Sequence, residues 1–105
     1  MDESEFERIA NEMIDRIEAG LDACDADLDF QLAAGGVLEV EFADGSKIIV
    51  NRHGAAQEIW VAARSGGFHF RFGEGQWRDT RSGEELLAAL SRLSTLQAGE
   101  PVCLA

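Results

Sequence analysis

The middle of the chain carries several short runs in which every second residue is apolar. These runs are "VLEVEF" (37–42), "SKIIV" (46–50), "QEIWVAA" (57–63) and "FHFRF" (68–72). A period of two is typical of strands that bury one face only. Asp44-Gly45 is a hairpin turn signal, and Trp77 begins another short run after "GEG" (73–75). The pattern predicts five or six antiparallel strands whose apolar face must be covered by another layer.

Two helical patterns flank the strands. Over residues 4–24 the apolar residues recur at three- and four-residue steps, and Ser4 with Glu7 fits a capping box. Over 82–96 a leucine stripe follows a second such pair, Ser82 with Glu85, and Gly99 fits a helix stop. We therefore expect an α+β fold with a single domain over 1–105. In this two-layer α-β sandwich, the N- and C-terminal helices pack on one face of the sheet.

Negative charge is concentrated at the start of the chain. The net charge is −11, and residues 1–29 hold 11 of the 20 acidic residues but only two of the nine basic ones. This balance disfavours nucleic acid as a partner and favours a cation or a basic protein surface. We expect no membrane span, because no apolar run is long enough, and no secretory signal, because the chain opens with acidic residues. We also expect a reducing compartment, since Cys24 and Cys103 are far apart and form no C-x-x-C motif.

The acidic residues of the first helix fall in one stripe on a helical wheel. The stripe, here called the acidic ridge, contains Glu7, Asn11, Asp15, Glu18, Asp22 and Asp25. Arg8 and Arg16 fall elsewhere, so the ridge has no basic partner in sequence. Asp27 and Asp29 extend it if residues 25–30 are extended. The ridge is either an ordinary solvated face or an open site for hard cations such as iron, Mg²⁺, Ca²⁺ and Mn²⁺.

A calcium loop does not explain the Asp-x-Asp-x-Asp spacing of residues 25–29. Phe30 stands where an EF-hand needs glycine, and Gly36 stands where it needs glutamate.

The same alternation predicts which side chains lie on the outer face of the sheet. If Ile59 and Val61 point into the core, Trp60 points out. The outward residues are then Asn51, Glu58, Trp60, Ala62, His69 and Arg71. A large aromatic side chain on an open sheet face indicates a contact site. The alternative is that the strand is shifted by one residue and Trp60 belongs to the core. Another open point is whether the nearby arginines only form ion pairs: Arg71, Arg78 and Arg81 with Glu58 and Asp79.

Three segments resemble the bacterial frataxin (CyaY) family. They are "NRHGAAQEIWVA" (51–62), "GGFHF" (66–70) and "WRDTRSGEEL" (77–86). The resemblance implies a cytoplasmic protein that binds Fe²⁺ and Fe³⁺ weakly at exposed carboxylates. It implies a role in iron–sulfur cluster assembly as iron donor or regulator, with the cysteine desulfurase and the scaffold protein as partners. It also implies a monomer that oligomerises, if at all, with iron.

Residue roles follow by position from this resemblance. The implied metal ligands are Glu3, Glu7, Glu18, Asp22, Asp25, Asp27 and Asp29. The implied partner contacts are Asp15, Glu18, Asp22, Asn51, Glu58, Trp60 and His69. The chain departs from the family pattern at His53, Ala55 and Glu58, and its first strand has Gln31 and Ala33 where acids are common.

Two other functions remain open at this point. The first is a pure protein–protein regulator of the desulfurase whose cation binding is incidental. The second is a ferroxidase, which we disfavour because no Glu-x-x-His sequence occurs and a di-iron site uses that motif on facing helices. We therefore expect a protein that is not an enzyme.

Overall fold

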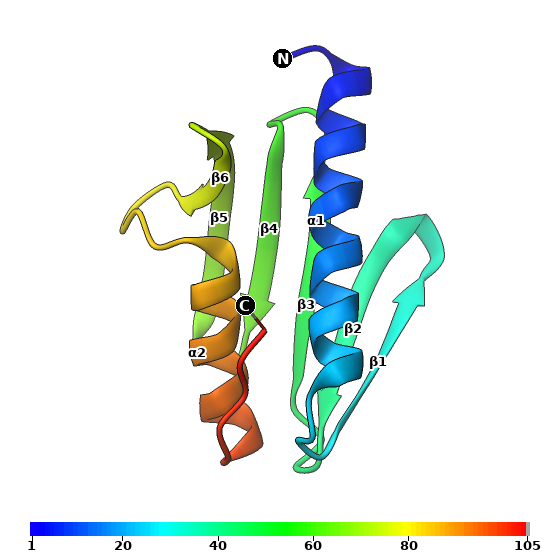
Figure 1. Cartoon of the computed structure of the whole chain (residues 1–105), viewed down its shortest axis with the longest axis vertical. Coiled ribbons are helices and arrows are strands. Elements are labelled where there is room, and N and C mark those ends of the chain that lie inside the picture. The colour runs from blue at the N-terminus through cyan, green and yellow to red at the C-terminus, as the bar shows by residue number, and fades with distance from the viewer. Residues whose placement is uncertain (105) are drawn as a thin grey trace.

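The computed structural model describes residues 1–104 and contains two layers, one of helices and one of strands (Figure 1). The elements are α1 (Glu3–Ala23), β1 (Leu28–Ala33), a 3-10 turn η1 (Ala34–Gly36), β2 (Val37–Phe42), β3 (Lys47–His53), β4 (Glu58–Ala63), β5 (Gly66–Gly73), β6 (Gln76–Asp79) and α2 (Leu86–Ala98). The six strands form one antiparallel sheet in the order β1-β2-β3-β4-β5-β6. Both helices cover the same face of this sheet, as predicted.

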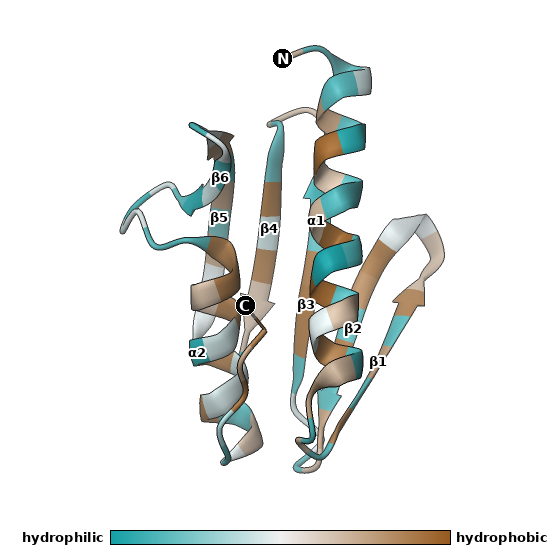
Figure 2. Cartoon of the chain, viewed as in Figure 1, coloured by the Kyte–Doolittle hydropathy of each residue, from teal (hydrophilic) through white to brown (hydrophobic). Residues whose placement is uncertain are grey.

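The core lies between the helices and that face. Figure 2 shows apolar positions alternating with polar ones along the strands. The predicted direction of the side chains is confirmed: Ile59 and Val61 are buried, whereas Trp60 is half-buried on the opposite side. Phe6 and Phe72 both pack their rings edge-on against the buried Trp77, which ties α1 to the far edge of the sheet. Among residues 1–104, no helix covers the outer face of the sheet.

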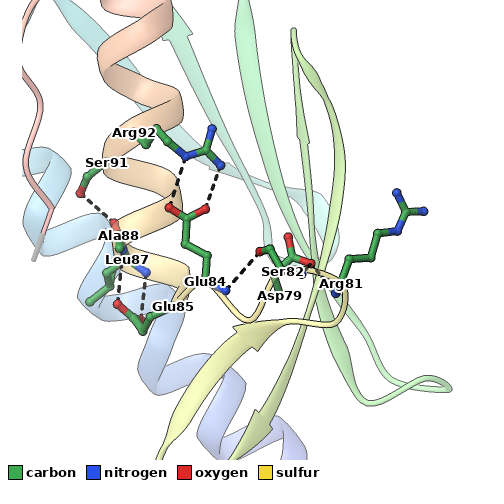
Figure 3. Close-up of polar contacts among 9 residues, drawn as sticks. All are labelled: Asp79, Arg81, Ser82, Glu84, Glu85, Leu87, Ala88, Ser91 and Arg92. Carbon is green, nitrogen blue, oxygen red and sulfur yellow. Dashed lines mark hydrogen bonds and ion pairs between the residues drawn. The ribbon is translucent and has the colours of Figure 1, made fainter.

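The helices begin differently from the sequence-based expectation. The N-cap of α1 is Asp2, whose carboxylate accepts the backbone N–H of Glu5 at 2.8 Å, so Ser4 does not cap the helix. α2 begins at Leu86, and Glu85 itself caps it by accepting the N–H groups of Leu87 and Ala88 (Figure 3). Both predicted capping boxes are therefore wrong, whereas the predicted stop at Gly99 is confirmed by its left-handed conformation, φ 70°.

Residues 79–85 form a hydrogen-bonded loop, which explains why α2 starts late. The Asp79 carboxylate accepts the N–H groups of Arg81 (2.7 Å) and Ser82 (3.3 Å), and the Ser82 hydroxyl accepts that of Glu84 (Figure 3). Such Asx-type turns compete with helix formation. Arg92 then donates two hydrogen bonds to the Glu84 carboxylate and fixes the loop to α2.

Candidate functional site: the acidic ridge and the outer sheet face

The structure places the C-terminal part of the acidic ridge on an accessible surface. Asp15 and Asp22 are exposed along α1 and Glu18 is half-buried. Asp25 and Asp27, in the segment that leads into β1, and Asp29, in β1 itself, are exposed and alternate with half-buried residues. Among residues 1–104, no ion pair involves any of these six carboxylates. Glu3 is also exposed, in the first turn of α1.

The N-terminal part of the ridge has a basic partner, although none lies near it in the sequence. Arg52 of β3 donates to the Glu7 carboxylate at 2.7 Å, to the Asn11 side-chain oxygen at 2.5 Å and to the Gly35 carbonyl at 3.2 Å. Arg52 lies 45 positions from Glu7 in the chain, so no local spacing could reveal the pair. Its guanidinium neutralises Glu7, and the uncompensated field therefore begins at Asp15.

Negative charge continues from β1 across the outer face of β2, which the sequence-based assignment of the ridge missed. Asp29 lies directly opposite Glu41, and Gln31 lies opposite Glu39. Lys47 of β3 is 3.7 Å from Glu39 and partly offsets this charge. These residues line a shallow hollow on the sheet surface. The alternation in "VLEVEF" already directs both glutamates outward, but only strand pairing puts them beside Asp29.

The carboxylates form an open field and not a cage. Within the described part of the chain, no three histidine, cysteine, aspartate or glutamate side chains converge in a geometry that could hold a metal ion. The oxygen ligands nevertheless suit hard cations, which accept carboxylates and water together. The arrangement favours several loosely held, hydrated ions over one ion with a complete protein coordination shell.

The outer face of β3, β4 and β5 carries a stack of three rings. Trp60 lies between His53 and His69, with ring centroids 3.9 Å and 4.4 Å away and interplanar angles of 11° and 9°. Strand register explains the His69 side of the stack, because Asn51, Trp60 and His69 form one row across the sheet, whereas His53 is opposite Glu58 and reaches Trp60 diagonally. The row brings three predicted contact residues together. His53 was recognised in the sequence only as a departure from the family pattern.

Glu58 lies beside this stack, two residues before Trp60 on β4, and is the most buried acidic residue of the outer face, at 7% exposure. Its carboxylate accepts the indole N–H of Trp60 and a guanidinium N–H of Arg71, each at 2.8 Å, while His69 Nδ1 lies 3.6 Å away. The Trp60 hydrogen bond and then the Arg71 contact hold the pKa of Glu58 below its usual 4.5, against the effect of burial. The ionised glutamate therefore fixes the orientation of the indole.

The other two arginines near this face behave differently from the expected ion pairs. Arg78 donates to the Gly83 carbonyl and to the Gln76 side-chain oxygen, both uncharged. Asp79 accepts backbone N–H groups instead of an arginine side chain. Of the predicted arginine pairs, the described residues thus contain only Arg71–Glu58.

Neither helix of residues 1–104 is long and apolar enough to cross a bilayer.

Comparison with known proteins agrees with this architecture. Residues 1–100 match the frataxin-like domain family. The chain is 64% identical over 104 residues to the iron-sulfur cluster assembly protein CyaY of Dechloromonas aromatica, covering 99% of both chains. It is 54% identical over 102 residues to the protein of the same name from Paraburkholderia phymatum, covering 97% of this chain and 96% of the relative.

Solved structures of frataxins have the same fold. The frataxin from Psychromonas ingrahamii superposes with a TM-score of 0.91 at 33% identity, covering 100% of this chain and 99% of that one. Trimeric frataxin from the yeast Saccharomyces cerevisiae, complexed with ferrous, gives a TM-score of 0.68 at 22% identity, covering 95% of this chain and 88% of that one, a likeness of fold alone. With residues 1–100 matched by the family model and its sheet and helices superposed, the chain belongs to the frataxin family.

Proposed function

We propose that this protein is an iron-binding adaptor of iron–sulfur cluster assembly that acts in the cytoplasm and is not itself an enzyme. The observation that carries the proposal is the run of uncompensated carboxylates from Asp15 to Asp29 on an accessible surface. The assembly role is supported by two relatives that are 64% and 54% identical to this chain, both named as iron-sulfur cluster assembly proteins. Iron is then the hard cation that the oxygen ligands take, as cargo held loosely and passed on.

The proposed mechanism is electrostatic. The ridge concentrates Fe²⁺ through Glu18, Asp22, Asp25, Asp27 and Asp29, and Fe³⁺ binds to the same oxygens. The same field attracts a basic surface of the cysteine desulfurase, with Asp15, Glu18 and Asp22 as contacts. Iron and partner therefore compete for one set of carboxylates, and iron loading tunes docking. We place Glu7 at the weak end of the metal set because Arg52 already neutralises it. Glu3 joins it there, because it lies in the first turn of α1, away from the uncompensated carboxylates that begin at Asp15.

The outer-face residues Asn51, Glu58, Trp60 and His69 form the second proposed contact, directed at the scaffold protein. Trp60 is half-buried in a stacked, hydrogen-bonded site, so little conformational entropy is lost when a partner contacts it.

A charge-reversal pair tests the ridge. Glu18→Lys with Asp22→Lys should abolish the Fe²⁺-induced amide NMR shifts of residues 15–29 and weaken association with the desulfurase, measured by calorimetry. Glu5→Lys with Glu12→Lys is the matched control, since it makes the same change in net charge on the same helix but off the ridge. Equal effects of both pairs would show that only overall charge matters and would refute the ridge.

The alternative is a pure protein–protein regulator whose cation binding is incidental. A reconstituted cluster assay separates the two functions. An adaptor that delivers iron requires the iron-loaded protein, whereas a regulator has the same effect on the desulfurase when Fe²⁺ is supplied free. Docking by either mechanism should weaken as salt rises, because exposed charges are screened beyond about 8 Å at physiological ionic strength.

A further inference from the structure

The outer face of the sheet is electrically polarised from one edge to the other. β1 and β2 present Asp29, Glu39 and Glu41, next to the acidic ridge. At the opposite edge, β5 and β6 present Arg71 and Arg78 directly across from each other. Figure 1 shows these two edges on opposite sides of the molecule, with β3 and β4 between them.

The arginine pair needs explaining, because like charges on directly opposed residues destabilise a sheet. Arg71 is partly offset by Glu58, yet its side chain remains 65% exposed. Arg78 bonds only uncharged oxygens and is exposed, so its guanidinium forms no ion pair among residues 1–104. Glu74 lines the same surface hollow as these two arginines. A chain of net charge −11 thus keeps an outward-facing cationic pair at the edge farthest from its ridge.

The ring stack beside the arginines offers edges and hydrogen-bond donors, not aromatic faces. Both faces of the Trp60 indole are covered, by His53 and by His69. His53 Nδ1 accepts the backbone N–H of Ala56 at 3.2 Å, so in the neutral ring the proton lies on Nε2 as a donor. The acceptor of this cluster, Glu58, is buried and already bonded. Ring edges carry positive potential, so they add to the cationic character of the surface.

We propose that the outer face of β4–β6 is a docking surface for an acidic segment of a partner protein. Arg71 and Arg78 determine the specificity, and the closed stack of His53, Trp60 and His69 is contacted at its edges. This inference rests on the proposed role in cluster assembly and gives the partner's chemistry at the second contact. The two faces then need opposite charges: a basic surface meets the ridge and an acidic one meets β5 and β6. That polarity fixes the orientation of the protein in the complex.

A charge-removal pair tests the surface. Arg71→Gln with Arg78→Gln should weaken binding to the reconstituted complex of cysteine desulfurase and scaffold protein by about tenfold, mainly through a slower, less salt-dependent association rate. Arg71→Lys with Arg78→Lys, which keeps the charges, should restore most of the association rate. The control is Arg8→Gln with Arg64→Gln, which removes two exposed and paired arginines from other surfaces. The control should bind like the unmodified protein.

The outcomes separate this inference from the proposed function. If ridge reversal abolishes binding while the Arg71 and Arg78 glutamine pair binds normally, the docking surface is refuted and the adaptor stands. If the unmodified protein does not bind the complex, both are refuted.

The stack itself is tested in the isolated protein by NMR. The ring protons of His53 and His69 should be shifted upfield by the indole and should lose that shift in Trp60→Leu. Unshifted protons in the unmodified protein would show that the faces of Trp60 are open and would overturn the edge-contact geometry.

Discussion

Removing Arg52 should destabilise the protein far more than removing an exposed arginine. Arg52 joins α1 to β3 and to the β1–β2 connection through Glu7, Asn11 and the Gly35 carbonyl. Its side chain is only 21% exposed, so water replaces these hydrogen bonds poorly. Hydrogen bonds to charged groups contribute about 1.5–3 kcal/mol each. The total loss is smaller than their sum, because the Glu7 carboxylate is 44% exposed and regains hydrogen bonds to water. We expect Arg52→Gln to lower the free energy of unfolding by about 2–3 kcal/mol.

Chemical denaturation in urea measures this change. For a domain of this size, a loss of about 2 kcal/mol lowers the melting temperature by roughly 8–16 °C. Arg64→Gln is the matched control, because the Arg64–Asp44 pair joins two strand connections at 2.8 Å but is 57% and 45% exposed. Exposed pairs contribute about 0–1 kcal/mol, so the control should stay close to the unmodified protein.

A double-mutant cycle with Glu7→Gln identifies the source of the effect. The two substitutions should be less damaging together than the sum of the single changes, since both remove the same ion pair. If Arg52→Gln is no more destabilising than Arg64→Gln, or if the cycle shows additivity, Arg52 is not the counter-ion that neutralises the N-terminal part of the ridge.

Three further predictions concern other parts of the fold. Gln97→Leu should cost about 2–3 kcal/mol in urea unfolding, because the buried amide bonds the backbone N–H of Arg64, between β4 and β5, and the carbonyl of Lys47, at the start of β3, and both groups lose this partner; an unchanged stability would contradict this. Gly20→Ala should destabilise the protein by about 1 kcal/mol or more despite the better helix propensity of alanine, since the new Cβ would lie 2.9 Å from the backbone oxygen of Leu104; faster amide exchange in residues 102–104 is the accompanying signature. Glu58→Gln should lower the melting temperature at neutral pH, and the difference should shrink as pH falls below about 4.5. The reason is that the pKa of Glu58 is depressed in the folded state, so its ionised form stabilises that state fully above about pH 4.5 and progressively less as the carboxylate is protonated. A difference that is independent of pH would contradict the assignment.

The order and direction of the elements could be read from the sequence because those signals are local. A period of two in residues 57–63 puts Trp60 on the face opposite Ile59 and Val61, whatever lies beside the strand. The helical wheel likewise aligns Asp15, Glu18 and Asp22, since residues three and four apart share a helix face. Periodicity fixes how a side chain points relative to its own element, and burial of the apolar face then selects two layers.

Helix starts were harder to predict, because a capping pattern competes with the hydrogen bonds that the surrounding loop can make. Ser82 and Glu85 have the spacing of a capping box, yet Asp79 draws residues 81 and 82 into a turn and Glu85 caps the helix alone. The prediction failed because several polar side chains in one short segment can bond the same backbone groups.

The sequence by itself determined that the N-terminal segment is acidic, amphipathic and followed by one-sided strands. Only the tertiary structure decided that Arg52 neutralises Glu7, that Glu41 lies beside Asp29, and that His53 and His69 cover both faces of Trp60. These contacts join residues on different elements, and which elements are neighbours depends on how the whole sheet pairs and packs. Local spacing holds no information about such neighbours, so the charge that the ridge presents could be measured only in the folded chain.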